Sequence, residues 1–302
     1  MPVSVVALGV RSTQETVFAV KFPRVLTRAL ALAAIATVAA CSSSSSPSSS
    51  SVPTKVGVVL DHAPVGTVSL SWSATTKTIT ANFNMHGFTP DTSHAVHIHH
   101  GSCANQGNVV IPFPDISAGT GGAVKASLTS SVTAPGGIPA GSYLNVHLAP
   151  SAQLGKPGSL GFTPIACADV PSGSTTSATL TMQALPQAGQ HPSGAAHVSY
   201  DAATKTLTVL LTATGLAPSS VHAAHIHLGS CQTQGPVKYP LDTVTANASG
   251  SASVTTVFKK VAGGPPADGW YVNLHMGSPS QILSSGKPTL LFAPILCGNV
   301  PG

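Results

Sequence analysis

Charged residues are scarce along this 302-residue chain. Beyond residue 41 it contains no arginine and no glutamate, and only nine lysines and seven aspartates remain. Charged residues make up 7 % of the whole chain, whereas about 25 % is typical of globular proteins. A surface built instead from Ser, Thr, Asn, Gln and Gly is typical of an exported β protein.

These absences exclude whole classes of function. The sequence has no basic patch and no aromatic side chains interleaved with basic ones, so it lacks the features of a nucleic-acid-binding protein. The missing glutamate argues against most acid–base hydrolases. No Ser-His-Asp pattern, carboxylate pair or phosphate-binding loop stands out.

The N-terminal apolar run is too short to cross a bilayer, which takes about 20 residues. It covers residues 29–40 and follows three basic residues, the pattern of a targeting segment. It ends at Val38-Ala39-Ala40-Cys41, which resembles a bacterial lipobox. The resemblance implies cleavage before Cys41 and lipidation of its thiol. A secretory signal with an incidental cysteine is the alternative.

We therefore expect a signal peptide over residues 1–40 and a lipid-anchored protein on the extracytoplasmic face of the cell membrane. Within residues 41–53, positions 42–51 are all serine except for Pro47. Such a tract cannot bury apolar surface, so it is expected to form a flexible tether. The expected partner is the membrane, reached through the lipid on Cys41, and no nucleic acid is expected.

Beyond residue 54 the sequence is that of a β protein. Apolar and polar residues alternate over residues 66–72 and 78–85, and again over 194–200 and 206–212. Nearly all of the 29 glycines and all of the 25 prolines fall outside these short segments. The pattern predicts two all-β domains, at residues 54–172 and 178–302.

A histidine-rich stretch occurs twice, 128 residues apart. The copies are His94-Ala-Val-His97-Ile-His99-His100-Gly-Ser-Cys103 and His222-Ala-Ala-His225-Ile-His227-Leu-Gly-Ser-Cys231. Residues i and i+2 of a strand point to the same face, so each His-x-His places two imidazoles side by side. A second motif follows at the same offset: Tyr143-Leu-Asn145-Val-His147 and Tyr271-Val-Asn273-Leu-His275.

Each domain thus offers three spaced imidazoles, two from one strand and one from a distant strand. If the strands are neighbours, the three rings converge as ligands for copper or zinc, of which copper binds more tightly on general grounds. The alternative is that these histidines only pack and form hydrogen bonds. The candidate ligands are His97, His99, His147, His225, His227 and His275.

The chain has five cysteines, and beyond Cys41 each half keeps two. Outside the cytoplasm an even count predicts disulfides. No C-x-x-C spacing supports a cysteine-ligated metal. Each closed loop would contribute roughly 4 kcal/mol in the chain-entropy estimate. The expected pairs are Cys103 with Cys167 and Cys231 with Cys297.

Together, H-A-x-H-I-H-x-G-S-C and Tyr-x-Asn-x-His resemble the chordin-type (CHRD) domain of exported bacterial proteins. The resemblance covers both halves. It implies tandem β-sandwich domains of immunoglobulin-like or Greek-key type, with no established biochemical activity. The family's G-E-I-R-G strand is missing, because Leu160-Gly-Phe-Thr-Pro164 and Leu290-Leu-Phe-Ala-Pro294 occupy that region. We therefore expect a diverged, disulfide-bearing branch.

A weaker resemblance is to copper/zinc superoxide dismutase, which also carries a His-x-His strand, a cysteine soon after it, a late histidine and a disulfide. The chain lacks a counterpart of that family's metal-bridging histidine, its zinc-site cluster and its arginine. We expect a binding or structural module that holds one copper or zinc ion per domain, with no catalytic residue assigned. A dismutase-like copper enzyme and a metal-free structural module are the alternatives.

Overall fold

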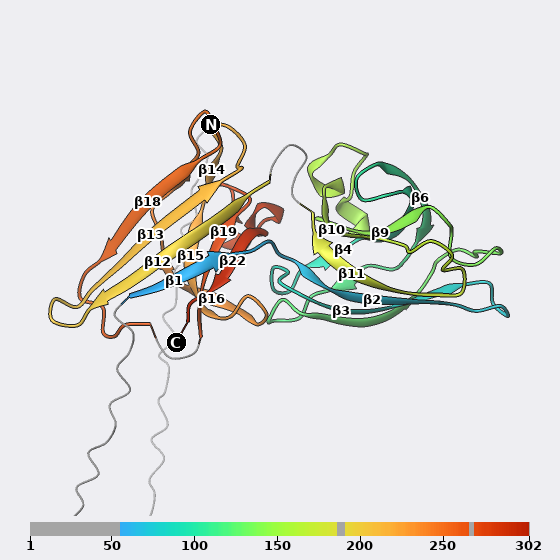
Figure 1. The fold of residues 1–302 in the computed structure, drawn as a ribbon, viewed down its shortest axis with the longest axis horizontal. Helices are drawn as coiled ribbons and strands as arrows, with labels where there is room; N and C mark the ends of the chain where they lie inside the picture. Colours follow the sequence, from blue (N-terminus) through green and yellow to red (C-terminus); the bar gives the residue numbers. More distant parts are fainter. Residues whose placement is uncertain (1–54, 186–190, 266–268, 302) are drawn as a thin grey trace, which may run out of the picture. The chain divides into compact units, whose positions relative to one another are not determined.

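The computed structural model describes residues 55–185, 191–265 and 269–301, and this part of the chain is all-β. The predicted fold class is confirmed: the strands form curled sheets of a β-sandwich (Figure 1). Among these described residues, helix is confined to three 3₁₀ turns, η1 (Ser151–Gln153), η2 (Leu160–Phe162) and η3 (Leu290–Phe292). Within the described ranges no helix is long and apolar enough to span a membrane. The expected signal peptide, Cys41 and the serine tether lie outside these ranges.

We call one set of strands the first lobe, which comprises residues 65–169 together with 177–184. Its eight long strands hydrogen-bond in the order β6-β5-β9-β10-β11-β2-β3-β8. Their bounds are β2 (Val65–Trp72), β3 (Ile79–His86), β5 (Val96–Gly101), β6 (Gln106–Pro112), β8 (Val124–Thr129), β9 (Ser142–His147), β10 (Pro164–Asp169) and β11 (Ser177–Ala184). A separate pair consists of β4 (Ser93–His94) and β7 (Ile116–Ser117).

The second lobe, residues 55–60 together with 193–299, repeats this order as two four-stranded sheets. These are β16-β15-β19-β22 and β1-β12-β13-β18. The bounds are β1 (Lys55–Leu60), β12 (Ser193–Asp201), β13 (Thr206–Thr214), β15 (Ala224–Gly229), β16 (Gln234–Pro240), β18 (Ala252–Phe258), β19 (Trp270–His275) and β22 (Pro294–Asn299). Two short strand pairs also occur, β14 (Val221–His222) with β17 (Val244–Thr245) and β20 (Leu283–Ser284) with β21 (Lys287–Pro288). An isolated bridge joins Asp61 and Cys297.

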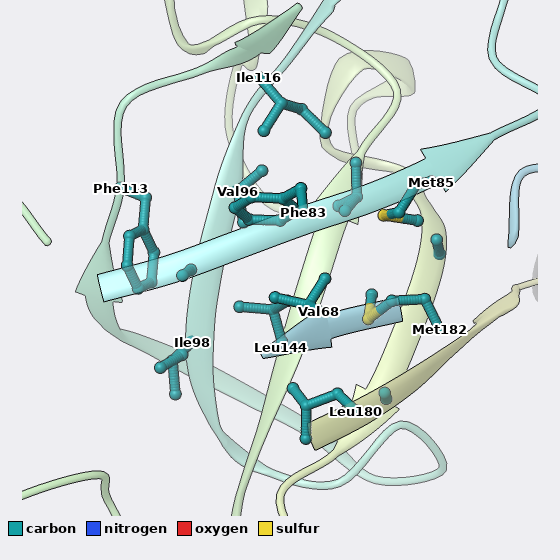
Figure 2. Close-up of a cluster of buried hydrophobic side chains, with 14 of the residues drawn as sticks. Val68, Phe83, Met85, Val96, Ile98, Phe113, Ile116, Leu144, Leu180 and Met182 are labelled. Atoms are coloured by element: carbon teal, nitrogen blue, oxygen red, sulfur yellow. The ribbon is translucent and has the colours of Figure 1, made fainter. Parts of the chain in front are cut away.

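The hydrophobic core of each lobe lies between the facing layers of its curled sheets. In the first lobe the alternating pattern of β3 buries Phe83 and Met85, and the pattern of β5 buries Val96 and Ile98. Figure 2 shows these side chains in one cluster with Leu180 and Met182 of β11. Since apolar burial contributes about 25 cal/mol per Å², β11 supplies part of the first lobe's stability.

The first strand of each expected domain pairs in the other lobe. β1, at the start of the 54–172 segment, pairs along its length with β12, and Lys55 lies opposite Ser199. β11, at the start of the 178–302 segment, pairs with β2, and Ser177 lies opposite Ser71. Figure 1 shows β1 beside β12 and β11 beside β2. The chain therefore exchanges two strands between its lobes.

Both predicted disulfides are confirmed. Cys103 is bonded to Cys167, and Cys231 is bonded to Cys297, each with 5.9 Å between the two Cα atoms. Each bond ties the turn after a histidine strand to β10 or β22, the strand on the far side of β9 or β19.

Candidate metal centre

The histidine strands of the first lobe lie side by side. β5 pairs antiparallel with β9, so His97 lies opposite Asn145 and His99 lies opposite Tyr143. The alternation sends Val96, Ile98, Leu144 and Val146 into the core. The opposite face of the sheet carries His97, His99 and His147, which are 8 %, 2 % and 0 % exposed. The three predicted side chains are therefore brought together and buried.

The second lobe repeats the arrangement. β15 pairs with β19, so His225 lies opposite Asn273 and His227 lies opposite Tyr271. His227 and His275 are buried, and His225 is a little more exposed. In each lobe one donor nitrogen from each of the three histidines lies within 4.8 Å of the other two.

Backbone carbonyls determine which nitrogens carry protons in the first lobe. His99 donates its Nδ1–H to the carbonyl oxygen of Gly107 at 3.0 Å, and His147 donates its Nδ1–H to that of Phe162 at 2.8 Å. In the neutral rings the Nε2 atoms are then unprotonated. These two Nε2 atoms lie 3.3 Å apart. Two lone pairs at this distance cannot hydrogen-bond to each other, and a cation bound between them would relieve their repulsion.

The third ring completes the set. Nδ1 of His97 lies 3.2 Å from Nε2 of His147. In the tautomer protonated on Nε2, His97 presents an Nδ1 lone pair to the same point as the other two rings. The donor set is therefore one Nδ1 and two Nε2 atoms.

The second lobe leaves one of these nitrogens without any partner. His227 and His275 donate their Nδ1–H groups to the carbonyl oxygens of Gly235 and Phe292. Nδ1 of His225 lies 2.9 Å from Nε2 of His275. Nε2 of His227 is buried and has no hydrogen-bond partner. Such an orphaned buried acceptor costs about 1–3 kcal/mol, and a bound cation would satisfy it.

Burial keeps these rings neutral. Desolvation lowers the pKa of His97, His147 and His225 from 6.5 to about 4. It also lowers the pKa of His99 and His227, and it holds the pKa of His275 well below 6.5. Neutral imidazole is the form that binds metal, so the protein holds its candidate ligands in the binding form at neutral pH.

The geometry suits a first-row transition metal. Nitrogens bound to zinc at about 2.0–2.1 Å in trigonal or tetrahedral geometry lie roughly 3.3–3.6 Å from one another. The two separations in the first lobe, 3.2 and 3.3 Å, are already close to that range. Imidazole donors favour copper, zinc, iron or nickel over magnesium or calcium. The residues present therefore fit such an ion.

Aromatic rings pack against both triads, a feature that the sequence analysis did not assign. Tyr143 stacks on His99 with 5.1 Å between the ring centroids, and Tyr271 stacks on His227 at 4.9 Å. Phe162 packs against His147 at 4.5 Å, and Phe292 packs against His275 at 4.3 Å. The available signal was the tyrosine four residues before each late histidine.

The two asparagines beside the triads are buried, and their Oδ1 atoms have no hydrogen-bond partner. Asn145 and Asn273 stand opposite His97 and His225 in the strand register. Their unpaired oxygens add to the unsatisfied polar atoms on this face of each sheet.

Other histidines have different roles. His94 bonds through Nδ1 to the carbonyl oxygen of His147 and through Nε2 to the hydroxyl of Thr92. His222 makes the same two bonds, to His275 and Ser220. Both nitrogens are occupied, so this pair supports the ligand strand and does not join the triad. His100 is exposed.

The two centres differ in their charged surroundings. The carboxylate of Asp115 lies close enough to raise the pKa of His97, against the larger lowering by burial. It also accepts hydrogen bonds from the backbone N–H and the hydroxyl of Ser151. The position 128 residues later is Thr243, beside Asp242, so the second lobe does not repeat this carboxylate at the same position.

Comparison with known proteins gives one family match. No curated protein matches the chain significantly. Residues 176–280 match the model of the CHRD domain. The matched segment runs from β11 to the loop after β19, and it contains all three histidines of the second triad. The second histidine motif of this chain thus lies within a CHRD-type sequence.

Proposed function

We propose that this protein is a metal-binding module that holds one copper or zinc ion in each lobe, with the first lobe a second, diverged CHRD-like copy. The observation that carries the proposal is the buried Nε2 of His227, which has no partner. The facing Nε2 atoms of His99 and His147 make the same case in the first lobe. Copper is expected to bind more tightly than zinc, because Cu(II) has the higher affinity for imidazole sites.

Equilibrium titration tests the proposal. The mature chain is titrated with Cu(II) and with Zn(II), and bound metal is counted by elemental analysis after dialysis. The two triads predict two ions per chain. His99→Ala and His227→Ala should each remove one ion, and the double variant should bind none.

His100→Ala is the matched control, because this neighbouring ring is exposed and lies outside the triad. It should retain both ions. Failure of the native chain to take up either metal at neutral pH would reject the proposal and leave a structural module whose histidines only pack.

Lipid anchoring is a separate part of the proposed function. It is supported by the lipobox-like Val38–Cys41 and the serine-rich segment after it. In the producing cell, the native protein should sediment with membranes, and Cys41→Ser should be released or remain unprocessed. Mass spectrometry of the N-terminal peptide distinguishes a lipidated Cys41 from a free N-terminus produced by ordinary secretory cleavage.

A further inference from the structure

The donor nitrogens of both triads are turned away from water. In the first lobe, Nδ1 of His97 and Nε2 of His99 meet Nε2 of His147 at buried positions. In the second lobe, Nε2 of His227 is buried and has no partner. Zinc held by three protein ligands normally keeps a water molecule in its fourth position. The burial of these nitrogens disfavours that arrangement, so each triad is best matched to an ion that three donors satisfy.

The donors also carry no charge. In the described part of the chain, each group that could hold a metal consists of three histidines and includes no cysteine, aspartate or glutamate. Imidazole binds metal as the neutral ring, so the net charge of a filled site equals the charge of the ion. The Born cost of burying an ion grows with the square of its charge, so an uncompensated divalent ion costs about four times as much as a monovalent one. Each triad therefore penalises Cu(II) and Zn(II) more than Cu(I).

The aromatic rings beside the triads add neither a donor nor a charge. Phe162 lies against His147, and Phe292 lies against His275, with centroid separations of 4.5 and 4.3 Å. Cu(II) favours square-planar or tetragonal surroundings, which take at least four donors. Cu(I) is stable with two or three donors. The composition of each site therefore agrees with the monovalent ion in donor number as well as in charge.

We propose that both triads are selective for copper in its monovalent state, Cu(I), which each triad holds through its three imidazole nitrogens. This inference rests on the proposed function, which places an ion in each triad, and it adds the oxidation state of that ion. The protein transfers no electron in this role, because the copper is taken up already reduced. The role that follows is the sequestration of Cu(I) in a site closed to water.

The two lobes should be selective to different degrees. The carboxylate of Asp115 acts electrostatically on His97, and none of the described carboxylates acts in this way on His225. A nearby negative charge stabilises a divalent ion more than a monovalent one, because the attraction is proportional to the charge of the ion. The second lobe should therefore discriminate more strongly against Cu(II).

Anaerobic titration of the mature chain tests the selectivity. Cu(I) is supplied as its acetonitrile complex in competition with bathocuproine disulfonate, and Cu(II) and Zn(II) are each titrated in competition with nitrilotriacetate. The two triads predict two Cu(I) ions per chain. Each should bind at least about tenfold more tightly than Cu(II) or Zn(II), because of the larger cost of burying a divalent charge. The loaded chain should keep its copper through desalting and give no Cu(II) electron paramagnetic resonance signal.

Asp115→Asn removes the nearby charge and keeps the shape of the side chain. In a His227→Ala background, which leaves the first site alone, it should raise the ratio of Cu(I) affinity to Cu(II) affinity several-fold. In a His99→Ala background, which leaves the second site alone, it should not change that ratio.

Two outcomes of the titration would overturn the proposal, and they differ in what they leave standing. Two ions of Cu(II) or Zn(II) per chain, bound at least as tightly as Cu(I), would refute the selectivity and leave the metal-binding function intact. No uptake of any of the three ions would reject the metal-binding function as well.

Discussion

At the scale of single residues, each triad is oriented by backbone carbonyls. Gly107 and Gly235 lie eight residues after His99 and His227, and their carbonyl oxygens accept the Nδ1–H groups. The bond fixes the tautomer, so Nε2 is left free for an ion. Carbonyl acceptors carry no side-chain signal, so the role of these two glycines could not be predicted from the sequence.

Gly107→Ala should weaken metal binding in the first lobe. A Cβ at this position would overlap the carbonyl oxygen of His100, so the strand that carries the acceptor for His99 must shift. Loss of such a supporting bond typically lowers metal affinity about 10–100-fold. Metal titration of Gly107→Ala in a His227→Ala background, where the second site is lost, measures the affinity of the first site alone. Gly119→Ala, whose Cβ meets nothing closer than 3.8 Å, should leave the affinity unchanged.

The metal-free protein should lose stability on mild acidification. His97, His147 and His225 have a pKa of about 4 in the folded protein against 6.5 in the unfolded chain. Below pH 6.5 the unfolded state binds more protons, so the free energy of unfolding falls as the pH drops from 6.5 through 4. Urea unfolding with a chelator present measures the slope. A variant with His97→Gln and His225→Gln should show a shallower dependence of the unfolding free energy on pH. A native chain whose unfolding free energy does not change between pH 6.5 and 4 would contradict the lowered pKa values of these histidines.

At the scale of elements, the turns after β5 and β15 are each held at two points. Cys103 forms the disulfide with β10, and its backbone N–H donates to Asp169 at 2.7 Å. In the second lobe Cys231 is bonded to β22, and its N–H donates to Asn299. These contacts secure the start of β6 and β16, which carry the carbonyl acceptors for the histidines.

Replacing Cys103 and Cys167 by serine should lower the free energy of unfolding by about 2–5 kcal/mol, the usual cost of removing a native disulfide. The loop closed by the bond spans 64 residues. Urea denaturation of the oxidised native chain gives the reference. The same change at Cys231 and Cys297 should cost a similar amount, because that loop spans 66 residues. A loss below 1 kcal/mol in both would contradict a structural role.

Much of the candidate site followed from sequence spacing, while strand partners did not. The period-two pattern correctly placed His97 and His99 on one face, and the repeat linked them to His147. The partner of β1 could not be predicted, because Val58 and Leu60 match the core face of either lobe. A four-residue connection is also an ordinary hairpin length, so folding back onto β2 was equally consistent with the sequence.

At the scale of the whole molecule, the second lobe depends on β1, which lies ahead of the first lobe in sequence, and the first lobe depends on β11, which begins the second sequence repeat. Val58→Asp should destabilise the second lobe although residue 58 lies in the first half of the chain. Leu180→Asp should destabilise the first lobe. A charge without a partner in a core costs several kcal/mol, so amide hydrogen exchange should rise selectively in the lobe that loses its strand.

The matched controls are Val59→Asp and Thr179→Asp, neighbouring positions on the exposed faces of the same two strands. Both should leave the exchange pattern nearly unchanged. If Val58→Asp instead loosened β2 and β3 while β12 and β13 stayed protected, the strand exchange would be refuted.

The exchange also decides where mechanical load enters the molecule. A pull on the chain ahead of Lys55 acts first on β1, whose six residues are held against β12. Tension from the N-terminal side therefore reaches the second lobe before it reaches β2, although β2 is next in sequence. The lobe farther along the chain bears the force, and its histidine sheet is joined to the far end of β1 through the bridge between Asp61 and Cys297.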